Sequence, residues 1–443
     1  MNSALQALRS VTKPGSLWLV GGCVRDELLG SPPKDDYDLV TEGDALAMAQ
    51  AIWEAGVSEI APVTYPRFGT AMVQVQGIRV ELVSARRESY DSESRKPDVE
   101  PATLLEDAQR RDFTCNALLR NLHSGELYDP LGVGLEDLRS GILRTPLEPG
   151  KTFIDDPLRM LRAVRFKHRL GFEFAPGLAE AIRDHASRLQ IISAERIAEE
   201  LLKMLPGPNP DRALDELREL GLLAEFLPEA LEMVGVEQGS WHHLDVWGHT
   251  LSVVRQAPPE VRLAALFHDI GKPQTRTVED GAIRFLGHEK VGAEMAIQIL
   301  RRLKFSNEDV HRVSLLVRHH MRIGSLAPAS KSAYRRFLRD LGDLAEAQLD
   351  LCEADQRGQN PEAPKLDFVQ IRARLAEVQT ETPVQTLISP LTGEEIMEIL
   401  QLPAGPEVGA AKSWLAEQVI EGHLASGDRE LARTLLIHHY VSS

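Results

Sequence analysis

Two aspartates separated by one residue, Asp36 and Asp38, have the type and spacing that chemistry on phosphates requires. They lie in the segment DYDLV, whose composition predicts a strand, and the two-residue period of a strand places both carboxylates on one face. Carboxylates this close repel each other, and a divalent cation relieves the repulsion. Mg²⁺ held by one or two carboxylates and by substrate phosphates is typical of nucleotidyl and phosphoryl transfer. We therefore expect Asp36 and Asp38 to bind Mg²⁺.

The elements expected around this pair would bring it next to a phosphate. The run GSLWLV predicts a buried strand that ends at Gly21, and the apolar spacing from residue 24 to residue 29 predicts a helix after Gly22. Glycine lets a phosphate approach the backbone, and the amides at a helix start attract anions. GTAMVQVQG and IRVELVSA predict two more strands, and the second carries Glu81, a candidate third carboxylate. A solvated acidic edge would explain the aspartates alone, but their place between this turn and these strands favours a catalytic pair.

The order of these motifs resembles the head domain of class II tRNA nucleotidyltransferases and of the related bacterial poly(A) polymerases. Three further segments agree with the family pattern: RRDFTCNAL at 110–118, DDPLRMLRAVRF at 155–166, and SARRESYDSESRKPDVEPATLLEDAQ at 84–109, which fills the place of the flexible loop. Asp155 stands where the family more usually has glutamate. The resemblance covers the chain from the first predicted strand to the start of the helical part.

The resemblance implies roles for individual residues. Asp36, Asp38 and Glu81 would be catalytic, with Mg²⁺ at the two aspartates. The triphosphate of CTP or ATP would meet the glycine turn and the arginine after it, and the ribose would meet the RRDFT segment. The implied nucleotide-binding residues are Gly21, Gly22, Arg25, Arg111, Asp112, Asp156, Arg159, Arg162 and Arg165. A salt bridge at a strand edge is the alternative interpretation of RRDFT.

Base selection is expected from Asp156 and Arg159, which are spaced by one helical turn. Cytosine and adenine each present an amino donor beside a ring-nitrogen acceptor, and uracil and guanine present the reverse order. The Asp156 carboxylate can accept from the amino group, and the Arg159 guanidinium can donate to the ring nitrogen. The pair would therefore select CTP and ATP. For Arg165 and Arg169, a solvated basic helix face is an equally good interpretation.

A second set of metal-ligating residue types occurs in the C-terminal half. Adjacent His268 and Asp269 in LAALFHDIGK offer an imidazole and a carboxylate that can hold or bridge divalent metals. The whole set is His249, His268, Asp269, His288, His319, His320 and Asp355, with His319 and His320 as alternative ligands of a second ion. It resembles the HD phosphohydrolase superfamily over residues 240–360. That resemblance implies a site for Ni²⁺, Mn²⁺ or Mg²⁺ and hydrolysis of 2′,3′-cyclic phosphates or phosphate ends; a structural cluster without activity is the alternative.

The composition of the chain restricts its number of domains, its location and the surfaces that could contact RNA. A chain of 443 residues with 43% hydrophobic residues is long enough for roughly two to four compact units. Cys23, Cys115 and Cys352 have no pairing or metal spacing, and no apolar run or signal-peptide core is present, so we expect a cytoplasmic protein without a membrane segment. The net charge of −16 argues against general nucleic-acid binding. RNA contact is therefore expected on local basic segments such as RMLRAVRFKHRLGF, RRLKF and KSAYRRFLR.

The secondary-structure pattern predicts an α/β nucleotidyltransferase head followed by an all-α body. Strand and helix patterns alternate in the first part of the chain, and helical periodicity dominates the rest. The expected division is a head at 1–140, a helical neck for nucleobase selection and RNA binding at 141–238, an HD-type domain at 239–360, and a helical tail for tRNA binding at 361–443.

These expectations combine into template-independent addition of CCA to tRNA 3′ ends from CTP and ATP, with phosphohydrolase activity at the HD site as an open question. An A-adding specialist that completes tRNA ending in CC and a poly(A) polymerase are alternatives within the class. A different class is a metal-dependent phosphohydrolase whose head only docks RNA. The polar, full-length segment from Arg87 to Gln109 disfavours a CC-only enzyme, because such enzymes in this family typically lack a competent flexible loop. The sequence separates neither CCA addition from A addition nor one oligomeric state from another.

Overall fold

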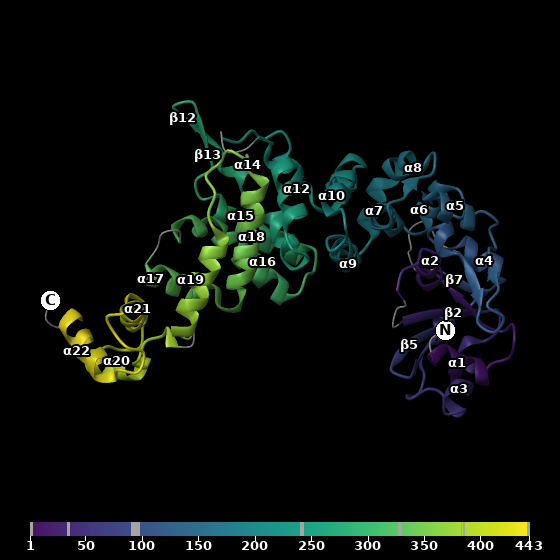
Figure 1. The fold of residues 1–443 in the computed structure, drawn as a ribbon, viewed down its shortest axis with the longest axis horizontal. Helices are drawn as coiled ribbons and strands as arrows, with labels where there is room; N and C mark the ends of the chain where they lie inside the picture. Colours follow the sequence, from purple (N-terminus) through teal and green to yellow (C-terminus); the bar gives the residue numbers. More distant parts are fainter. Residues whose placement is uncertain are drawn as a thin grey trace. The chain divides into compact units, whose positions relative to one another are not determined.

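The computed structural model describes residues 3–32, 36–89, 98–239, 243–326, 330–381, 383 and 386–440. The chain divides into two compact units, residues 1–228 and residues 229–443. In Figure 1 the first unit is coloured from purple to teal and the second from teal to yellow. Within the described ranges, no helix is both long enough and apolar enough to cross a membrane.

A mixed sheet of seven described strands organises the first unit. Its strand order is β3-β4-β5-β2-β1-β8-β9. β2 and β5 are parallel, and the other neighbouring pairs are antiparallel. The bounds are β1 (Trp18–Val20), β2 (Asp36–Thr41), β3 (Val63–Tyr65), β4 (Thr70–Val75), β5 (Ile78–Ser84), β8 (Leu119–Asn121) and β9 (Leu127–Tyr128). The strands predicted around the aspartate pair are therefore confirmed.

One face of this sheet is packed and the other is open. Leu39, Val80 and Leu82 are fully buried on the packed face, which α3 (Ala45–Glu54) covers with its apolar side. α3 begins after Asp44, whose carboxylate accepts hydrogen bonds from two backbone amides of the first turn. Because side chains alternate along a strand, the two aspartates of β2 fall on the open face.

Helices and two short ladders complete the first unit. The flexible-loop segment forms a hairpin of β6 (Arg86–Ser89) and β7 (Asp98–Pro101), and its connecting residues 90–97 lie outside the described ranges. A parallel ladder joins β10 (Ile142–Leu143) to β11 (Glu173–Phe174). The helices are α1 (Ser3–Val11), α2 (Gly22–Leu28), α4 (Leu104–Gln109), α5 (Gly134–Ser140), α6 (Pro149–Asp155), α7 (Leu158–Leu170), α8 (Leu178–His185), α9 (Ala194–Met204), α10 (Pro210–Glu219) and α11 (Leu222–Phe226), with 3-10 turns η1 (Pro66–Phe68), η2 (Thr114–Asn116) and η3 (Ala186–Ile191).

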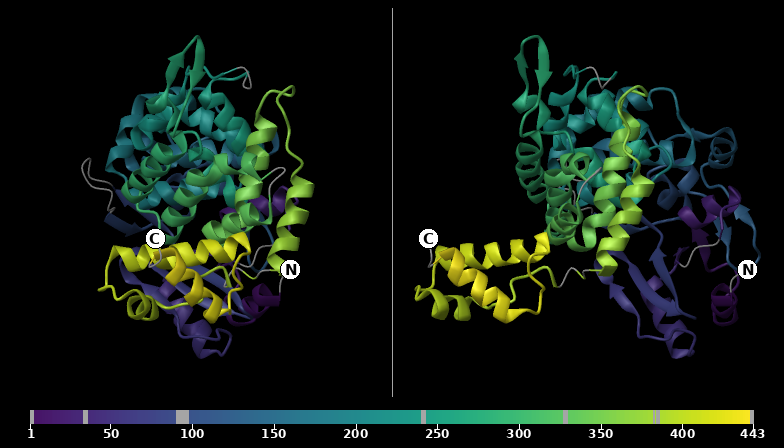
Figure 2. Two further views of the ribbon diagram at one scale, coloured as in Figure 1. Left: turned by 90° about the vertical axis from the view of Figure 1, so that its left-hand side faces the viewer. Right: turned by 60° about the vertical axis from the view of Figure 1, so that its left-hand side comes forward.

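The second unit is mainly helical. Its helices are α12 (Val246–Gln256), α13 (Arg262–Phe267), α14 (Lys272–Thr275), α15 (His288–Arg302), α16 (Asn307–His319), α17 (Lys331–Leu341), α18 (Ala345–Gly358), α19 (Phe368–Glu381), α20 (Gly393–Leu400), α21 (Pro406–Glu421) and α22 (Arg429–Tyr440), with 3-10 turns η4 (Pro228–Met233), η5 (Pro259–Val261), η6 (His320–Ser325) and η7 (Gly342–Leu344). α12 packs on α13 and α18, and α15 packs on α16 (Figure 1). A hairpin of β12 (Thr277–Glu279) and β13 (Ala282–Arg284) projects from these helices in both views of Figure 2.

A continuous apolar core joins the last helices of the second unit. It runs in sequence from Ile323 to Leu436 and includes residues of α17, α19, α20, α21 and α22. The predicted fold class, an α/β head followed by a helical body, is confirmed. The β10–β11 ladder and the β12–β13 hairpin are short additions to the body that helical periodicity did not predict.

Candidate active site and candidate metal centre

Asp36 and Asp38 lie on the open face of β2, as the strand period predicted. Both side chains are exposed, and the Tyr37 side chain between them is buried on the opposite face. In the pairing of β2 with β5, Asp38 is opposite Glu81 and Asp36 is opposite Arg79. Directly opposed residues of neighbouring strands share a face. The structure therefore brings the three predicted catalytic carboxylates together.

The glycine turn before α2 and the side chain of Arg111 flank Asp38. Gly21 has a φ of +79°, which favours glycine. A Cβ atom at Gly21 would lie 3.7 Å from Asp38 Oδ2 and 3.8 Å from Arg111 Nη1, so these two side chains converge on the turn. Desolvation by surrounding protein raises the pKa of Asp38, neighbouring carboxylates, foremost Glu81, raise it further, and Arg111 opposes them. A bound cation would stabilise the ionised form of this desolvated carboxylate and offset the repulsion from Glu81.

Asp112 of the RRDFT segment is buried and already has protein partners at both carboxylate oxygens. One oxygen accepts hydrogen bonds from the Phe113 amide and from the Asn116 side chain. The other accepts two hydrogen bonds from the guanidinium of Arg162. Burial alone would raise the pKa of Asp112, but Arg162 and Asn116 lower it to about 2. Asp112 is therefore an anion held in a fixed position.

Three of the predicted nucleotide-binding arginines, Arg25, Arg159 and Arg165, are buried. Arg25 donates hydrogen bonds to Asp26 and to Asn116. Arg165 donates to Glu200, with 2.6 Å between Nε and Oε2. Arg165 is therefore not part of a solvated helix face, which was one of its two interpretations. Contact of Arg25 or Arg165 with a nucleotide stays a prediction, and both guanidinium groups already have buried protein partners.

The ring of Phe166 on α7 is a common support for three arginines. The guanidinium carbons of Arg25, Arg162 and Arg165 lie 4.9, 5.5 and 4.4 Å from the ring centre. The negative face of an aromatic ring attracts cations. Phe166 thus helps to hold α2, the RRDFT segment and α7 together, because Arg25 comes from α2 and Arg162 binds the RRDFT aspartate.

Asp156 and Arg159 lie at the junction of α6 and α7. The Asp156 carboxylate accepts a hydrogen bond from the Leu158 amide and forms an ion pair with Arg196, with 3.0 Å between Oδ2 and Nη2. Arg159 is buried, and its guanidinium donates to the backbone carbonyl of Arg110. Both predicted base-selecting side chains are therefore positioned by protein contacts, and Arg159 lies next to the RRDFT segment.

The second unit gathers a histidine and aspartate centre from several helices. On one side, His249 Nε2 lies 2.9 Å from Asp355 Oδ1 and 3.6 Å from Asp269 Oδ2. His268 Nε2 lies 3.2 Å from the same Asp269 oxygen. The geometry of His249, His268 and Asp269 could hold one metal ion.

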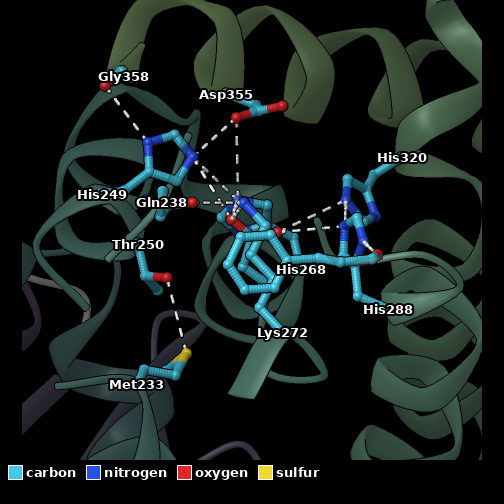
Figure 3. Close-up of polar contacts among 12 residues, drawn as sticks. Met233, Gln238, His249, Thr250, His268, Lys272, His288, His320, Asp355 and Gly358 are labelled. Atoms are coloured by element: carbon cyan, nitrogen blue, oxygen red, sulfur yellow. Dashed lines mark hydrogen bonds and ion pairs between the residues drawn. The ribbon is translucent and has the colours of Figure 1, made fainter. Parts of the chain in front are cut away.

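A second ligand group shares Asp269. The other oxygen of this carboxylate, Oδ1, lies 3.4 Å from His288 Nε2 and 3.8 Å from His320 Nε2. The two imidazole Nε2 atoms are 3.1 Å apart. Figure 3 shows His249 on one side of His268, and His288 and His320 on the other. Asp269 therefore stands between two groups that could each hold an ion.

The Nε2 atoms of the four histidines face the carboxylates and one another inside the centre. In each ring, Nδ1 lies within hydrogen-bond distance of a backbone carbonyl, and the four carbonyls belong to Gly358, Ala265, Phe285 and Val317. A neutral imidazole that donates from Nδ1 presents a lone pair at Nε2, the orientation typical of metal ligands. Asp269 is buried, and its Oδ2 faces the Nε2 atoms of His268 and His249. This donor set fits divalent metal ions.

Burial and neighbouring charges shift the ligands in different directions. Burial would lower the pKa of His268, but the charge and hydrogen bond of Asp269 raise it. Burial and the neighbouring His268 lower the pKa of His320 to about 3. Burial would raise the pKa of Asp355, but the hydrogen bond and charge of His249 lower it well below its usual range. The imidazole of His320 is therefore neutral and the Asp355 carboxylate is ionised at neutral pH. Lys272, which was not among the predicted site residues, has its Nζ 2.7 Å from Asp269 Oδ2.

The HDIGK turn packs directly on the start of α15. A Cβ atom at Gly271 would lie 2.4 Å from the carbonyl oxygen of His288 and 2.6 Å from the amide nitrogen of Gly292. A side chain cannot occupy that space without displacing the backbone. The glycine therefore allows the approach that brings His288 beside Asp269.

The structure distinguishes the adjacent histidines that the sequence left as alternatives. His320 joins the second ligand group, whereas His319 lies outside both groups and its Nδ1 is 3.1 Å from Arg322 Nη1. α16 ends at His319 and the following 3-10 turn begins at His320. The supporting residues that the sequence did not indicate are Asn116, Phe166, Arg196, Glu200 and Lys272. Of these, Asn116, Phe166 and Lys272 had a local signal, because they belong to the motifs RRDFTCNAL, DDPLRMLRAVRF and HDIGK.

Three families match successive parts of the chain. The family described as Poly A polymerase head domain matches residues 17–144, the family described as Probable RNA and SrmB- binding site of polymerase A matches residues 171–233, and the HD domain matches residues 240–360. The first match contains the sheet with the carboxylates, and the third contains the histidine centre. The protein is therefore a nucleotidyltransferase head followed by an HD domain.

Full-length relatives define the family more closely. The CC-adding tRNA nucleotidyltransferase of Thermus thermophilus is 37% identical over 96% of this chain and 94% of that protein. The A-adding tRNA nucleotidyltransferase of Deinococcus radiodurans is 35% identical over 91% of each chain. The crystal structure of the Bacillus stearothermophilus CCA-adding enzyme in complex with CTP matches with a TM-score of 0.71 and 26% identity, covering 100% of this chain and 99% of that one. The chain belongs to the tRNA nucleotidyltransferase family.

Proposed function

We propose that this protein adds CCA to the 3′ end of tRNA, using CTP and ATP. The observation that carries the proposal is the convergence of Asp36, Asp38 and Glu81 on one open sheet face, beside Gly21 and Arg111. Mg²⁺ ions held by the two aspartates would supply the charge stabilisation that an in-line displacement at phosphorus needs.

The residues around the carboxylates would position the incoming nucleotide. Gly21 leaves space for a triphosphate, and the neighbouring guanidinium of Arg111 adds positive charge. Asp112 would act on ribose selection from the fixed position that Arg162 and Asn116 give it. Gly22, Arg25 and Arg165 were predicted to contact the nucleotide as well, and the buried contacts of the two arginines support an indirect, positioning role instead.

Base selection would depend on the Asp156 carboxylate and the Arg159 guanidinium. Arg196 holds the carboxylate, and the Arg110 carbonyl holds the guanidinium. Because both groups are fixed by protein partners, they would present one acceptor and one donor in a constant order. A base with the reverse order would give neither group a hydrogen-bond partner on the base, which costs on the order of 1–3 kcal/mol for each lost hydrogen bond.

Incubation with radiolabelled CTP or ATP, separately and together, tests the proposal on tRNA transcripts that lack CCA or end in C, CC or CCA. A CCA-adding enzyme extends the first three transcripts to the mature end and stops there. Extension of the CC-ending transcript alone would identify an A-adding enzyme, the second candidate, which the 35% identity to the Deinococcus A-adding enzyme favours. A long ladder of A would identify a poly(A) polymerase.

CC addition alone is the remaining outcome of this experiment. The Thermus relative at 37% identity is named for that activity, whereas the full-length loop segment disfavours it. Residues 90–97 of that loop lie outside the described ranges. Incorporation of C without any incorporation of A would therefore overturn the CCA proposal and the prediction drawn from the loop.

We further propose that the histidine centre hydrolyses phosphoesters. The convergence of His249, His268, Asp269, Asp355, His288 and His320 on two adjacent positions supports this activity. A divalent metal bound there, Ni²⁺, Mn²⁺ or Mg²⁺, would lower the pKa of a coordinated water toward neutrality. Removal of a cyclic or terminal phosphate would regenerate the free 3′-hydroxyl that the head extends. The test is hydrolysis of 2′,3′-cyclic AMP and p-nitrophenyl phosphate with each metal; lack of hydrolysis with all of them would leave the centre as a structural element.

The remaining assignments follow from a tRNA substrate. We propose a nucleotidyltransferase head at 1–140, a neck at 141–238, an HD-type domain at 239–360, and a tail at 361–443 that contacts tRNA. The shared core of the last helices, from Ile323 to Leu436, supports a tail that is folded onto α17. A tRNA substrate would place the enzyme in the cytoplasm.

A further inference from the structure

A depression of about 380 Å³ lies beside the carboxylate cluster of Asp36, Asp38 and Glu81. It is lined by two aromatic rings, two arginines, Met72 and Glu81, the rings being Tyr65 and Phe68 and the arginines Arg79 and Arg86. Its volume falls in the range of about 300–1,000 Å³ that is usual for small-ligand pockets. One wall, Glu81, belongs to the carboxylate cluster, so the depression borders that cluster.

The register of the sheet places this pocket on the same face as the aspartates. Met72 on β4 is opposite Glu81 on β5, and Glu81 is opposite Asp38 on β2. At about 4.8 Å between neighbouring strands, Met72 is roughly 10 Å from Asp38. Tyr65 extends the same face to the edge strand β3, where it is opposite Thr70.

The pocket and the glycine turn lie on opposite sides of Asp38. Gly21 follows β1, which neighbours β2 on one side, and the pocket lies over β5, β4 and β3 on the other side. In phosphoryl transfer the attacking oxygen and the leaving oxygen are roughly in line across the phosphorus. If the triphosphate leaves on the Gly21 side, the attacking 3′-hydroxyl must approach from the pocket side.

The side chains of the pocket suit single-stranded RNA. Tyr65 and Phe68 are 53% and 39% exposed, so part of each ring faces solvent. Arg79 is 69% exposed and is 3.8 Å from Glu81. Arg86 donates to the Phe68 carbonyl and lies over the Phe68 ring, and Arg67 lies over the same ring. Exposed rings beside cationic side chains are the usual platform for unpaired bases and their phosphates.

We propose that this pocket receives the unpaired 3′-terminal nucleotide of the tRNA, with its base stacked on Tyr65 or Phe68 and its backbone beside Arg79 and Arg86. The proposal rests on the proposed nucleotide-adding function and names the site for its RNA substrate. Stacking there would direct the terminal ribose toward Glu81 and Asp38. The base contact is a stacking contact, so the site accepts C and A ends as the acceptor end grows.

Kinetics with substituted rings test this assignment. Tyr65→Ala and Phe68→Ala should each raise the KM for tRNA about 5- to 100-fold, the range usual for loss of one base–aromatic stack, and should leave the KM for CTP and ATP unchanged. Tyr65→Phe keeps the ring and should behave as wild type. Trp53→Ala is the matched control, because Trp53 is 40% exposed on α3, which covers the other face of the sheet.

Photocrosslinking separates this proposal from the proposed function. A tRNA with 4-thiouridine as its last nucleotide should crosslink to the peptide that contains Tyr65 and Phe68, even in a preparation that incorporates no nucleotide. A raised KM for CTP or ATP with an unchanged KM for tRNA would assign the pocket to the incoming nucleotide and overturn the proposal. Unchanged kinetics in both alanine variants, with crosslinks elsewhere, would show an unused surface.

Discussion

Arg162 donates two hydrogen bonds to a single carboxylate oxygen of Asp112. This contact joins α7 to the RRDFT segment, so the helix that carries Arg159 is fastened to the segment that was predicted to recognise the ribose. Asn116 holds the other oxygen of Asp112 and also accepts from Arg25 on α2. The predicted nucleotide-binding residues are thus linked to one another through buried ion pairs and hydrogen bonds.

The lowered pKa of Asp112 predicts a contribution to stability that disappears in acid. The pKa falls from an ordinary value of 3.8 to about 2 in the folded state. The contribution is therefore fully present above pH 4 and is lost as the pH falls toward 2, and its size is on the order of 2 kcal/mol. Urea unfolding of wild type and Asp112→Asn should show a difference at pH 7 that shrinks between pH 4 and pH 3. A difference that is constant over this range would contradict the assignment.

Loss of the Glu200 carboxylate should destabilise the first unit strongly. Glu200→Gln leaves the buried guanidinium of Arg165 without its charged partner, and such a change costs about 3–5 kcal/mol. Urea unfolding should show this loss, and the double variant with Arg165→Met should recover part of it. Glu199→Gln is the matched control, since Glu199 is exposed on the same helix. If Glu200→Gln unfolds at the same urea concentration as wild type, the prediction is wrong. That result would also mean that the ion pair between Glu200 and Arg162, which are 3.7 Å apart, does not stabilise the fold.

Replacement of Asp38 should abolish nucleotide incorporation without affecting the fold. Asp38→Ala removes the central carboxylate of the cluster, and its exposed position makes unfolding an unexpected result. The measurement is incorporation of labelled CTP and ATP, together with a tRNA-binding titration and a thermal melt. Asp44→Ala serves as a control, because Asp44 caps α3 and its loss should lower stability by about 1 kcal/mol while sparing incorporation. Near-normal incorporation by Asp38→Ala would refute the catalytic assignment.

Asp156→Ala should relax base selection. Without the carboxylate, UTP or GTP would no longer face an acceptor that their bases cannot satisfy, so their use relative to CTP and ATP should rise about 5- to 100-fold. Arg196→Ala should act in the same direction, since Arg196 holds the carboxylate. Glu180→Ala, an exposed position on α8, should change nothing. Competition assays with all four nucleotides measure the effect, and unaltered selectivity in Asp156→Ala would exclude the proposed base contact.

Variants of the adjacent residues His319 and His320 test which of them binds metal in the histidine centre. Asp269→Ala should remove metal-dependent phosphoester hydrolysis and lower the amount of metal retained after dialysis, while nucleotide addition continues. His320→Gln should lower metal retention, whereas His319→Gln should not, because His319 lies outside both ligand groups. Metal analysis of the dialysed variants makes the comparison independent of any activity. Equal metal loss from both histidine variants would show that the centre differs from the one described.

The local sequence pattern was sufficient to predict features that depend on the strand period or on a short motif. The two-residue period of β2 predicted correctly that Asp36 and Asp38 share a face, and the HDIGK motif predicted that His268 and Asp269 lie at a common centre. The choice between His319 and His320 depends on where α16 changes to a 3-10 turn, and neither residue type signals that change. Arg196 and Glu200 lie far along the chain from Asp156 and Arg162, so only the folded packing of α9 on α7 reveals them as partners.

The burial of Arg25 and Arg165 was also outside the reach of the sequence. A helix with arginines at three- and four-residue spacing has the same pattern whether those side chains meet solvent, RNA or buried carboxylates. The deciding partners are Asp26, Asn116 and Glu200, and the ring of Phe166. The number of arginines in the α7 sequence therefore overstated how many of them this helix can offer to a nucleic acid.

The close approach of Gly271 to the carbonyl of His288 has a consequence for ion choice. Main-chain atoms set the separation between the HDIGK turn and α15, so the span from Asp269 to His288 is fixed before any ion arrives. Replacement of a ligand side chain would weaken the binding of an ion but would not change the distance between the HDIGK turn and α15. A bulkier residue at position 271 would push the two segments apart and shift the preference toward larger ions. If the centre binds a metal, the main chain at this glycine would therefore limit the range of ionic radii that the second ligand group accepts.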